Sequence, residues 1–265
     1  MIATSTFNLN YLWLPLVGFV IGLLVTMFGG GGGFFYVPIL TLLFHVPTQL
    51  AAATSLAATI PTVIVGSIEH YRKGNVNLRI GLIFGGAGLI GAFAGAYFSN
   101  LISSALLQKL FGAYAILLTI PMILTNRKKS QDQTSEPTKH QPLKTMDIVL
   151  SFFFGLLSGA MAGLFGTSGT ATIVAGLYIL GLPVISVIGT SVMVVFFNAL
   201  SGFVGHVLVG QFDWMLVVLL GAGSILGAFV GPRLLTNINV KTLEKVYGVL
   251  FILLVVGFGL AMFFK

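Results

Sequence analysis

Long, almost uncharged apolar segments dominate this 265-residue chain and limit what it can fold into. An α-helix needs about 20 mainly apolar residues to cross the hydrocarbon core of a bilayer. Charged residues make up only 7% of the sequence, against about 25% in an ordinary soluble domain. The sequence therefore predicts an all-α, polytopic helical membrane protein in a lipid bilayer, with about 8–10 membrane segments. The candidate segments are 12–28, 49–69, 78–98, 105–125, 147–165, 184–205, 214–233 and 243–263, with shorter apolar pieces at 34–44 and 171–181.

Charge and composition argue against several other classes of protein. The formal net charge is +7, but the basic residues lie in short loops between apolar segments, where membrane topology explains them. We therefore expect no nucleic-acid partner. The chain has no cysteine, and its four histidines are not paired at the i, i+4 spacing that suggests zinc. No metal and no cofactor are expected.

One polar segment divides the chain into two similar halves. Residues 126–145 read as a solvent-exposed linker between a first transmembrane repeat, 11–125, and a second, 146–264. Aligning residues 47–118 with 183–254 gives 18 identities in 72 pairs, which indicates an internal duplication. The identical pairs include Pro47/Pro183, Thr54/Thr190, Ser55/Ser191, Gly66/Gly202, His70/His206, Gly74/Gly210 and Gly91/Gly227.

Each half contains a glycine-rich break between a longer and a shorter apolar segment. The first break is the run of five glycines at 29–33, and the second is GTSGT at 166–170. The two segments around a break would form a helix of roughly 50 Å at 1.5 Å per residue, too long for one straight crossing. Each pair must therefore be two crossings or a re-entrant hairpin. Either arrangement gives an odd number of crossings per half, which predicts two inverted repeats.

The distribution of basic residues supports the inverted arrangement. In that topology, 11 of the 13 Lys and Arg residues lie on one side of the membrane. The positive-inside rule assigns that side, including the linker, to the cytoplasm. We therefore expect a multi-pass protein of the cell inner (plasma) membrane, with both termini outside.

The two breaks are the first candidates for a binding site. Irregular backbone at membrane depth is tolerated where it is buried in protein or lines an aqueous cavity. The start of a half-helix also presents partial positive charge and free N–H groups to an anion. The alternative is that the glycines only allow close helix packing. The candidate substrate-binding residues in the breaks are Gly30, Gly31, Gly32, Gly33, Thr167, Ser168, Gly169 and Thr170.

Duplicated polar residues near the breaks are further candidates. Thr54, Ser55, Thr190 and Ser191 could face a ligand or bond to carbonyls of their own helices. Asn198 could contact a ligand or hold helices together. His70 and His206 end equivalent segments and are read either as hydrated helix ends or as gating or proton-linked residues. No carboxylate lies deep in an apolar segment, which favours an anionic or neutral substrate over a cation.

With these features, the sequence resembles the sulfite exporter TauE/SafE family of membrane transporters over roughly 15–125 and 147–263. The resemblance rests on a duplicated order: a glycine-rich break, a proline, a Thr-Ser pair, and a histidine followed four residues later by glycine. The second break departs from the family's glycine-rich pattern by reading GTSGT.

The resemblance implies a transporter, not an enzyme, for a small sulfur-containing anion such as sulfite or an organosulfonate like sulfoacetate. Binding is then expected at the interface of the two repeats. Coupling of transport to a proton and assembly into a homo-oligomer stay open. The alternative is an integral membrane accessory or enzyme subunit that acts on a small anion without transport.

Overall fold

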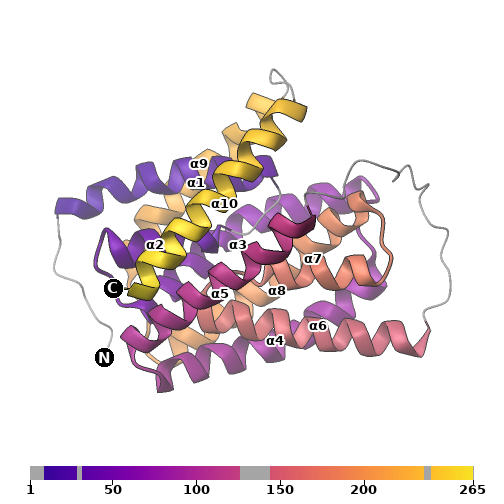
Figure 1. Ribbon diagram of the computed structural model, residues 1–265, viewed down its shortest axis with the longest axis horizontal. Helices are drawn as coiled ribbons and strands as arrows, with labels where there is room; N and C mark the ends of the chain where they lie inside the picture. Colours follow the sequence, from indigo (N-terminus) through magenta and orange to yellow (C-terminus); the bar gives the residue numbers. More distant parts are fainter. Residues whose placement is uncertain (1–8, 29–31, 126–143, 236–239, 265) are drawn as a thin grey trace.

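The computed structural model describes residues 9–28, 32–125, 144–235 and 240–264, and within them every regular element is a helix. Among the described residues, four helices, α3, α4, α6 and α8, are long and apolar enough to cross a membrane. The predicted all-α polytopic membrane fold is confirmed. The elements are η1 (Leu9–Trp13), α1 (Leu14–Phe28), α2 (Gly33–Leu42), α3 (Thr48–Arg72), α4 (Leu78–Leu101), α5 (Ser104–Thr125), α6 (Thr145–Phe165), α7 (Thr170–Ile179), α8 (Val184–Leu208), α9 (Trp214–Leu235) and α10 (Val240–Phe264) (Figure 1).

The same order of helices occurs twice along the chain. In each half a helix and a break precede a ten-residue helix, α2 or α7, and three long helices follow. Pro47 and Pro183 stand directly before α3 and α8. Gly74 and Gly210, both with φ above +70°, follow the ends of these helices. The proline and glycine signals set equivalent helix boundaries because neither residue favours an uninterrupted helix.

Small residues bring two pairs of helices into close contact, α4 with α6 and α1 with α9. A Cβ added to Gly159 of α6 would lie 2.1 Å from the carbonyl oxygen of Gly88. At the equivalent place, a Cβ on Gly22 of α1 would lie 2.3 Å from the carbonyl oxygen of Ser224. The first helix of each half therefore packs on the fourth helix of the other half.

The equivalent helices α3 and α8 cross in opposite directions. Gly66, late in α3, faces Val192, early in α8. Gly202, late in α8, faces Leu56, early in α3. Each of these contacts is the counterpart of the other when positions are matched at the spacing of the internal duplication. These two contacts between α3 and α8 are therefore related by an approximate two-fold exchange.

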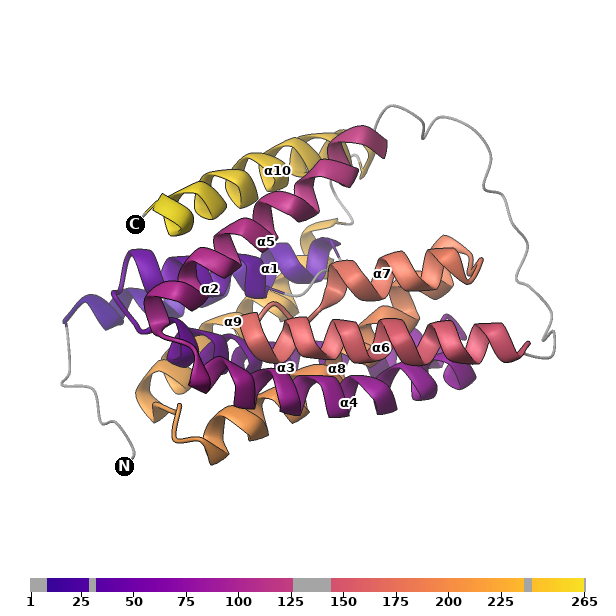
Figure 2. The ribbon, with the colours of Figure 1, turned by 60° about the horizontal axis from the view of Figure 1, so that its bottom comes forward.

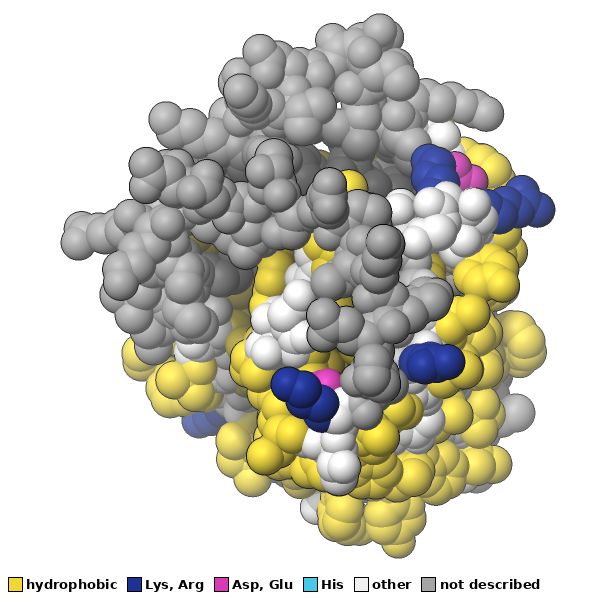
Figure 3. Space-filling view, turned by 90° about the vertical axis from the view of Figure 1, so that its right-hand side faces the viewer, with side chains coloured by type: hydrophobic (Ala, Val, Ile, Leu, Met, Phe, Trp, Pro, Cys, Tyr) yellow, Lys and Arg dark blue, Asp and Glu magenta, His cyan; other side chains and the backbone are white. Residues whose placement is uncertain are grey.

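Four of the five Lys and Arg side chains that the structure describes lie at one end of the bundle, and the fifth, Lys109, lies near the start of α5 at the other end. Arg72 and Lys73 end α3, Arg79 begins α4, and Lys144 precedes α6, which runs parallel to α4. Figure 3 shows this end, with Lys and Arg side chains set among a largely hydrophobic surface. At the opposite end, α4 ends and α10 reaches Phe264 (Figure 1).

The two short helices differ in burial. α2 is enclosed, with Phe34, Phe35, Tyr36, Val37 and Leu40 all buried in the main apolar core. In α7, only Ile173, Gly176 and Leu177 are buried. Figures 1 and 2 show why: α5 and α10 lie over α2, and α7 lies to their side.

Candidate functional site

The second break is a tight buried turn between α6 and α7. Gly166, Ser168 and Gly169 all have left-handed backbone, with φ of 71°, 63° and 69°. Glycine takes this conformation readily, whereas a residue with a Cβ is strained by roughly 1 kcal/mol. After the turn α7 folds back along α6, since a Cβ on Gly176 would lie 2.7 Å from the Phe154 ring. The ten residues of α7 span about 15 Å, half of a bilayer core.

Side chains from two other helices hold this turn in place. The Ser55 hydroxyl of α3 donates a hydrogen bond of 2.8 Å to the carbonyl of Gly166. The Asn198 amide of α8 donates to the carbonyl of Ser168 at 3.4 Å and to the Ser158 hydroxyl at 3.2 Å. Because Asn198 lies near the middle of α8, the turn is held well inside the bundle.

The two breaks meet directly. Gly33, the first residue of α2, lies against the backbone of the second break: an added Cβ would stand 2.1 Å from the Gly166 oxygen and 2.5 Å from the Thr167 Cα. Gly32 packs on the Tyr36 ring. The predicted site residues Gly30 and Gly31 lie outside the described residues. The start of α2 thus touches the turn that leads into α7, and both helix starts carry the partial positive charge that suits an anion.

Two hydroxyls of the second break have no partner in the described part of the chain. Thr167 and Ser168 are both 0% exposed, and neither Thr167 Oγ1 nor Ser168 Oγ makes a hydrogen bond there. A buried polar atom left unpaired costs about 1–3 kcal/mol. These two unpaired hydroxyls lie just before α7, which begins at Thr170.

The hydroxyls of the duplicated Thr-Ser pairs have different partners. Ser55 reaches the break, as described above. Thr54 and Ser191 donate instead to carbonyls of their own helices, Leu50 and Ile188, at 2.8 Å each. Thr190 accepts a 3.0 Å hydrogen bond from the backbone N–H of Asn77, which caps α4. The hydroxyls of Thr54, Thr190 and Ser191 thus have structural partners.

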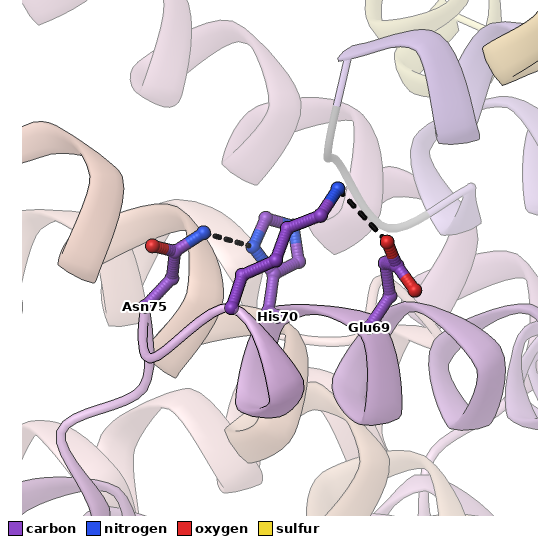
Figure 4. Close-up of polar contacts among 4 residues, drawn as sticks. Glu69, His70 and Asn75 are labelled. Atoms are coloured by element: carbon purple, nitrogen blue, oxygen red, sulfur yellow. Dashed lines mark hydrogen bonds and ion pairs between the residues drawn. The ribbon is translucent and has the colours of Figure 1, made fainter.

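The two candidate histidines, His70 and His206, lie at opposite ends of the bundle. His70 is half-buried near the end of α3, where Nδ1 lies 3.4 Å from the Asn75 amide nitrogen. Figure 4 shows it beside the ion pair between Lys73 and Glu69. His206 is buried, and its Nε2 donates to the carbonyl of Gly163 at 2.8 Å, one turn before the second break. His206 Nδ1 has no hydrogen bond with any described residue.

Tyr114 of α5 lies beside both breaks, which the sequence did not reveal. Its ring stacks on Phe34, next to Gly33, with centroids 6.0 Å apart, and on Phe165, next to Gly166, at 5.0 Å. The only signal in the sequence is a single tyrosine in the apolar segment 105–125. A tyrosine there is equally typical of ordinary packing.

Comparison with known proteins gives the class and the family. The chain is 34% identical over 235 residues to the "Probable membrane transporter protein YdhB" of Bacillus subtilis, covering 87% of this chain and 92% of that protein. It is 27% identical over 266 residues to "Probable membrane transporter protein YunE" of the same organism, covering 93% and 96%. A "Probable membrane transporter protein" of Xylella fastidiosa is 31% identical over 241 residues, covering 89% and 88%.

With its apolar helices, the chain is a multi-pass helical membrane transporter. The family described as "Sulfite exporter TauE/SafE" matches residues 14–258. The chain belongs to this family, and the resemblance seen in the sequence is confirmed. No solved structure matches the chain.

Proposed function

We propose that this protein transports a small sulfur-containing anion, sulfite or an organosulfonate such as sulfoacetate, and binds it where the two breaks meet. Membership of the sulfite exporter family supports the substrate class. The contact of Gly33 with Gly166 and Thr167 supports the location, because it brings a break from each repeat together. In this proposal, Thr167 and Ser168 donate hydrogen bonds to the anion from the start of α7.

The observation that carries the proposal is the pair of unpaired hydroxyls in the second break. Thr167 and Ser168 are fully buried and lack partners among the described residues, although buried polar groups are nearly always paired. A bound oxyanion would supply the missing acceptors. Gly169 and the first turn of α7 add the positive end of a helix dipole on the same side.

The placement of buried charge also favours an anion over a metal cation. The described buried side chains include one carboxylate, Asp213. Its Oδ1 accepts from the backbone N–H groups of Met215 and Leu216 at the start of α9. This carboxylate therefore caps a helix at an end of the bundle, away from the breaks at mid-helix depth.

We further propose inverted repeats in the inner membrane, with the basic end of the bundle in the cytoplasm and both termini outside. The opposite directions of α3 and α8 support the inversion. Arg72, Lys73, Arg79 and Lys144 at one end support the orientation. His70 and His206 would then lie on opposite sides, as candidates for gating or proton coupling.

The proposal is tested by ligand-dependent thermal stability of the purified chain with sulfite, sulfoacetate, sulfate and chloride. Sulfite or sulfoacetate should raise the melting temperature of the wild type. Ser168→Ala should weaken this effect by about fivefold in affinity, the worth of one hydrogen bond. Ser151→Ala is the matched control, because Ser151 is a buried serine of α6 that bonds its own helix at the Asp147 carbonyl.

Absence of stabilisation by every sulfur anion would count against the substrate class. Equal ligand effects in Ser168→Ala and Ser151→Ala would count against the site. Gly169→Leu is a poor test, since even a Cβ there would lie 2.2 Å from the backbone carbonyl oxygen of Ser158. Such a variant would fail by misfolding.

A further inference from the structure

Tyr114 joins both breaks to a helix that belongs to neither. Its ring lies between Phe34, which follows the first break, and Phe165, which precedes the second. The interplanar angles are 19° and 18°, so the three rings form a nearly parallel stack. Phe111, one turn earlier on α5, contacts the same two rings at centroid distances of 6.4 Å and 6.0 Å. Two turns of α5 therefore cover the place where the breaks meet.

The hydroxyl of Tyr114 is the third unpaired hydroxyl at this place. It approaches the hydroxyls of Thr167 and Thr172, yet it is buried and forms no hydrogen bond of good geometry with a described residue. Thr167 Oγ1 is likewise buried and makes no hydrogen bond with a described residue. Each hydroxyl can both donate and accept, so packing alone would favour their bonding to each other. A single acceptor placed between these two hydroxyls would pair both.

We infer that Tyr114 contacts the substrate, donating its hydroxyl proton to an oxygen of the anion beside Thr167. This inference rests on the proposed function. It adds α5 to the binding site and makes the Phe34–Tyr114–Phe165 stack one of its walls. The donors suit a small anion, and an oxyanion such as sulfite can present one oxygen that accepts from two hydroxyls at once.

Replacement of Tyr114 by phenylalanine separates binding from packing. Tyr114→Phe keeps both ring stacks and removes only the oxygen. If the oxygen binds substrate, affinity for sulfite falls about five- to tenfold, while the melting temperature without ligand stays the same or rises. If the ring only packs, affinity for sulfite is unchanged. Tyr97→Phe is the matched control, because Tyr97 lies exposed on α4 at 53% of its surface.

The experiment measures sulfite and sulfoacetate affinity by titration calorimetry on the full purified chain, for the wild type, Tyr114→Phe, Thr167→Val, their double variant and Tyr97→Phe. Two donors to one oxygen should be coupled, so the double variant should lose less than the product of the two single losses. Full affinity in Tyr114→Phe together with a loss in Thr167→Val would overturn the inference and leave the proposed function standing. Absence of binding by the wild type would overturn both.

A second measurement is made on the wild type and needs the variant only to assign one resonance. The chain has seven tyrosines, which can carry a 13C label at the ring carbon that bears the hydroxyl. Sulfite added to the wild type should shift one tyrosine resonance strongly, and Tyr114→Phe assigns it. No shifted tyrosine resonance at saturating sulfite would contradict the inference.

Discussion

Ser168 combines a strained backbone with a buried hydroxyl that has no partner among the described residues. It is a left-handed residue with a Cβ, between two left-handed glycines, Gly166 and Gly169. The matching position of the first repeat is a glycine, Gly31. Strain at a buried residue with an unpaired hydroxyl suggests a functional need for that hydroxyl.

The two roles of Ser168 are separable by substitution. Ser168→Gly should stabilise the unliganded protein by about 1 kcal/mol, because glycine relieves the left-handed backbone. It should also weaken sulfite binding by about 1 kcal/mol, because the donor is lost. Ser168→Ala should lose the same affinity without the gain in stability. Melting temperature and sulfite affinity of both variants check this; a destabilised Ser168→Gly variant would show that the hydroxyl is structural.

At the residue scale, the sequence predicted only part of the site. Thr167 and Ser168 are candidates because the second break repeats the glycine run of the first. Whether Thr54 or Ser55 faced the break could not be predicted, since that depends on the rotation of α3 against the break. Tyr114 was missed because its environment comes from three separate segments, which no local pattern brings together.

At the scale of elements, close helix contacts hold the repeats together. The contacts of α4 with α6 and of α1 with α9 place a glycine against the opposing backbone at equivalent positions. In a membrane such contacts gain from van der Waals packing rather than from hydrophobic burial. Disrupting one such contact should therefore cost a similar free energy of unfolding in both repeats.

Alanine substitutions test this equivalence. Gly159→Ala and Gly22→Ala would place a Cβ at 2.1 Å and 2.3 Å from backbone oxygens of the facing helix. Each should destabilise the protein by about 1–3 kcal/mol, as overpacking does. Gly86→Ala is the control: no atom lies within 4 Å of its added Cβ, so the variant should be as stable as wild type or up to about 1 kcal/mol more so. Thermal unfolding of the three variants measures this; wild-type stability in Gly22→Ala would contradict the equivalence.

Helix boundaries were the most predictable feature of the elements. The predicted pieces at 34–44 and 171–181 correspond to α2 (Gly33–Leu42) and α7 (Thr170–Ile179). Long apolar runs bounded by proline and glycine determine such limits locally. The sequence left open whether the second segment crosses or folds back. That outcome depends on the left-handed turn at Gly166–Gly169 and on its hydrogen bonds to Ser55 and Asn198.

At the scale of the whole molecule, the approximate two-fold relation predicts the topology. Lys73 follows α3 and Leu208 ends its counterpart α8, and the two helices run in opposite directions. The natural chain has no cysteine, so Lys73→Cys and Leu208→Cys can be labelled singly in intact cells. Both sites are exposed, at 62% and 70%. An impermeant maleimide should label the second from outside and the first only after lysis; labelling of both from the same side would contradict the inverted repeat.

The unequal cover of α2 and α7 predicts how the molecule moves. In inverted-repeat transporters one repeat rocks against the other around a fixed site. Val37 of α2 is fully buried here, and its counterpart in α7, Val174, is partly exposed. Exchange of the two environments during turnover should make Val37→Cys more reactive when sulfite is transported, and Val174→Cys less so. If sulfite changes the reactivity of neither cysteine, α5 and α10 do not move away from α2 during transport.

Flux of radiolabelled sulfite and sulfoacetate across proteoliposomes tests the central claim, transport of a small sulfur anion through the site between the breaks. Wild-type protein and the Ser151→Ala control should move at least one of these anions faster than empty liposomes. The Thr167→Val, Ser168→Ala double variant should fold normally and lose about tenfold or more in apparent affinity, since two hydrogen bonds are removed. No flux of either anion by the wild type, or undiminished affinity in the double variant, would contradict the account.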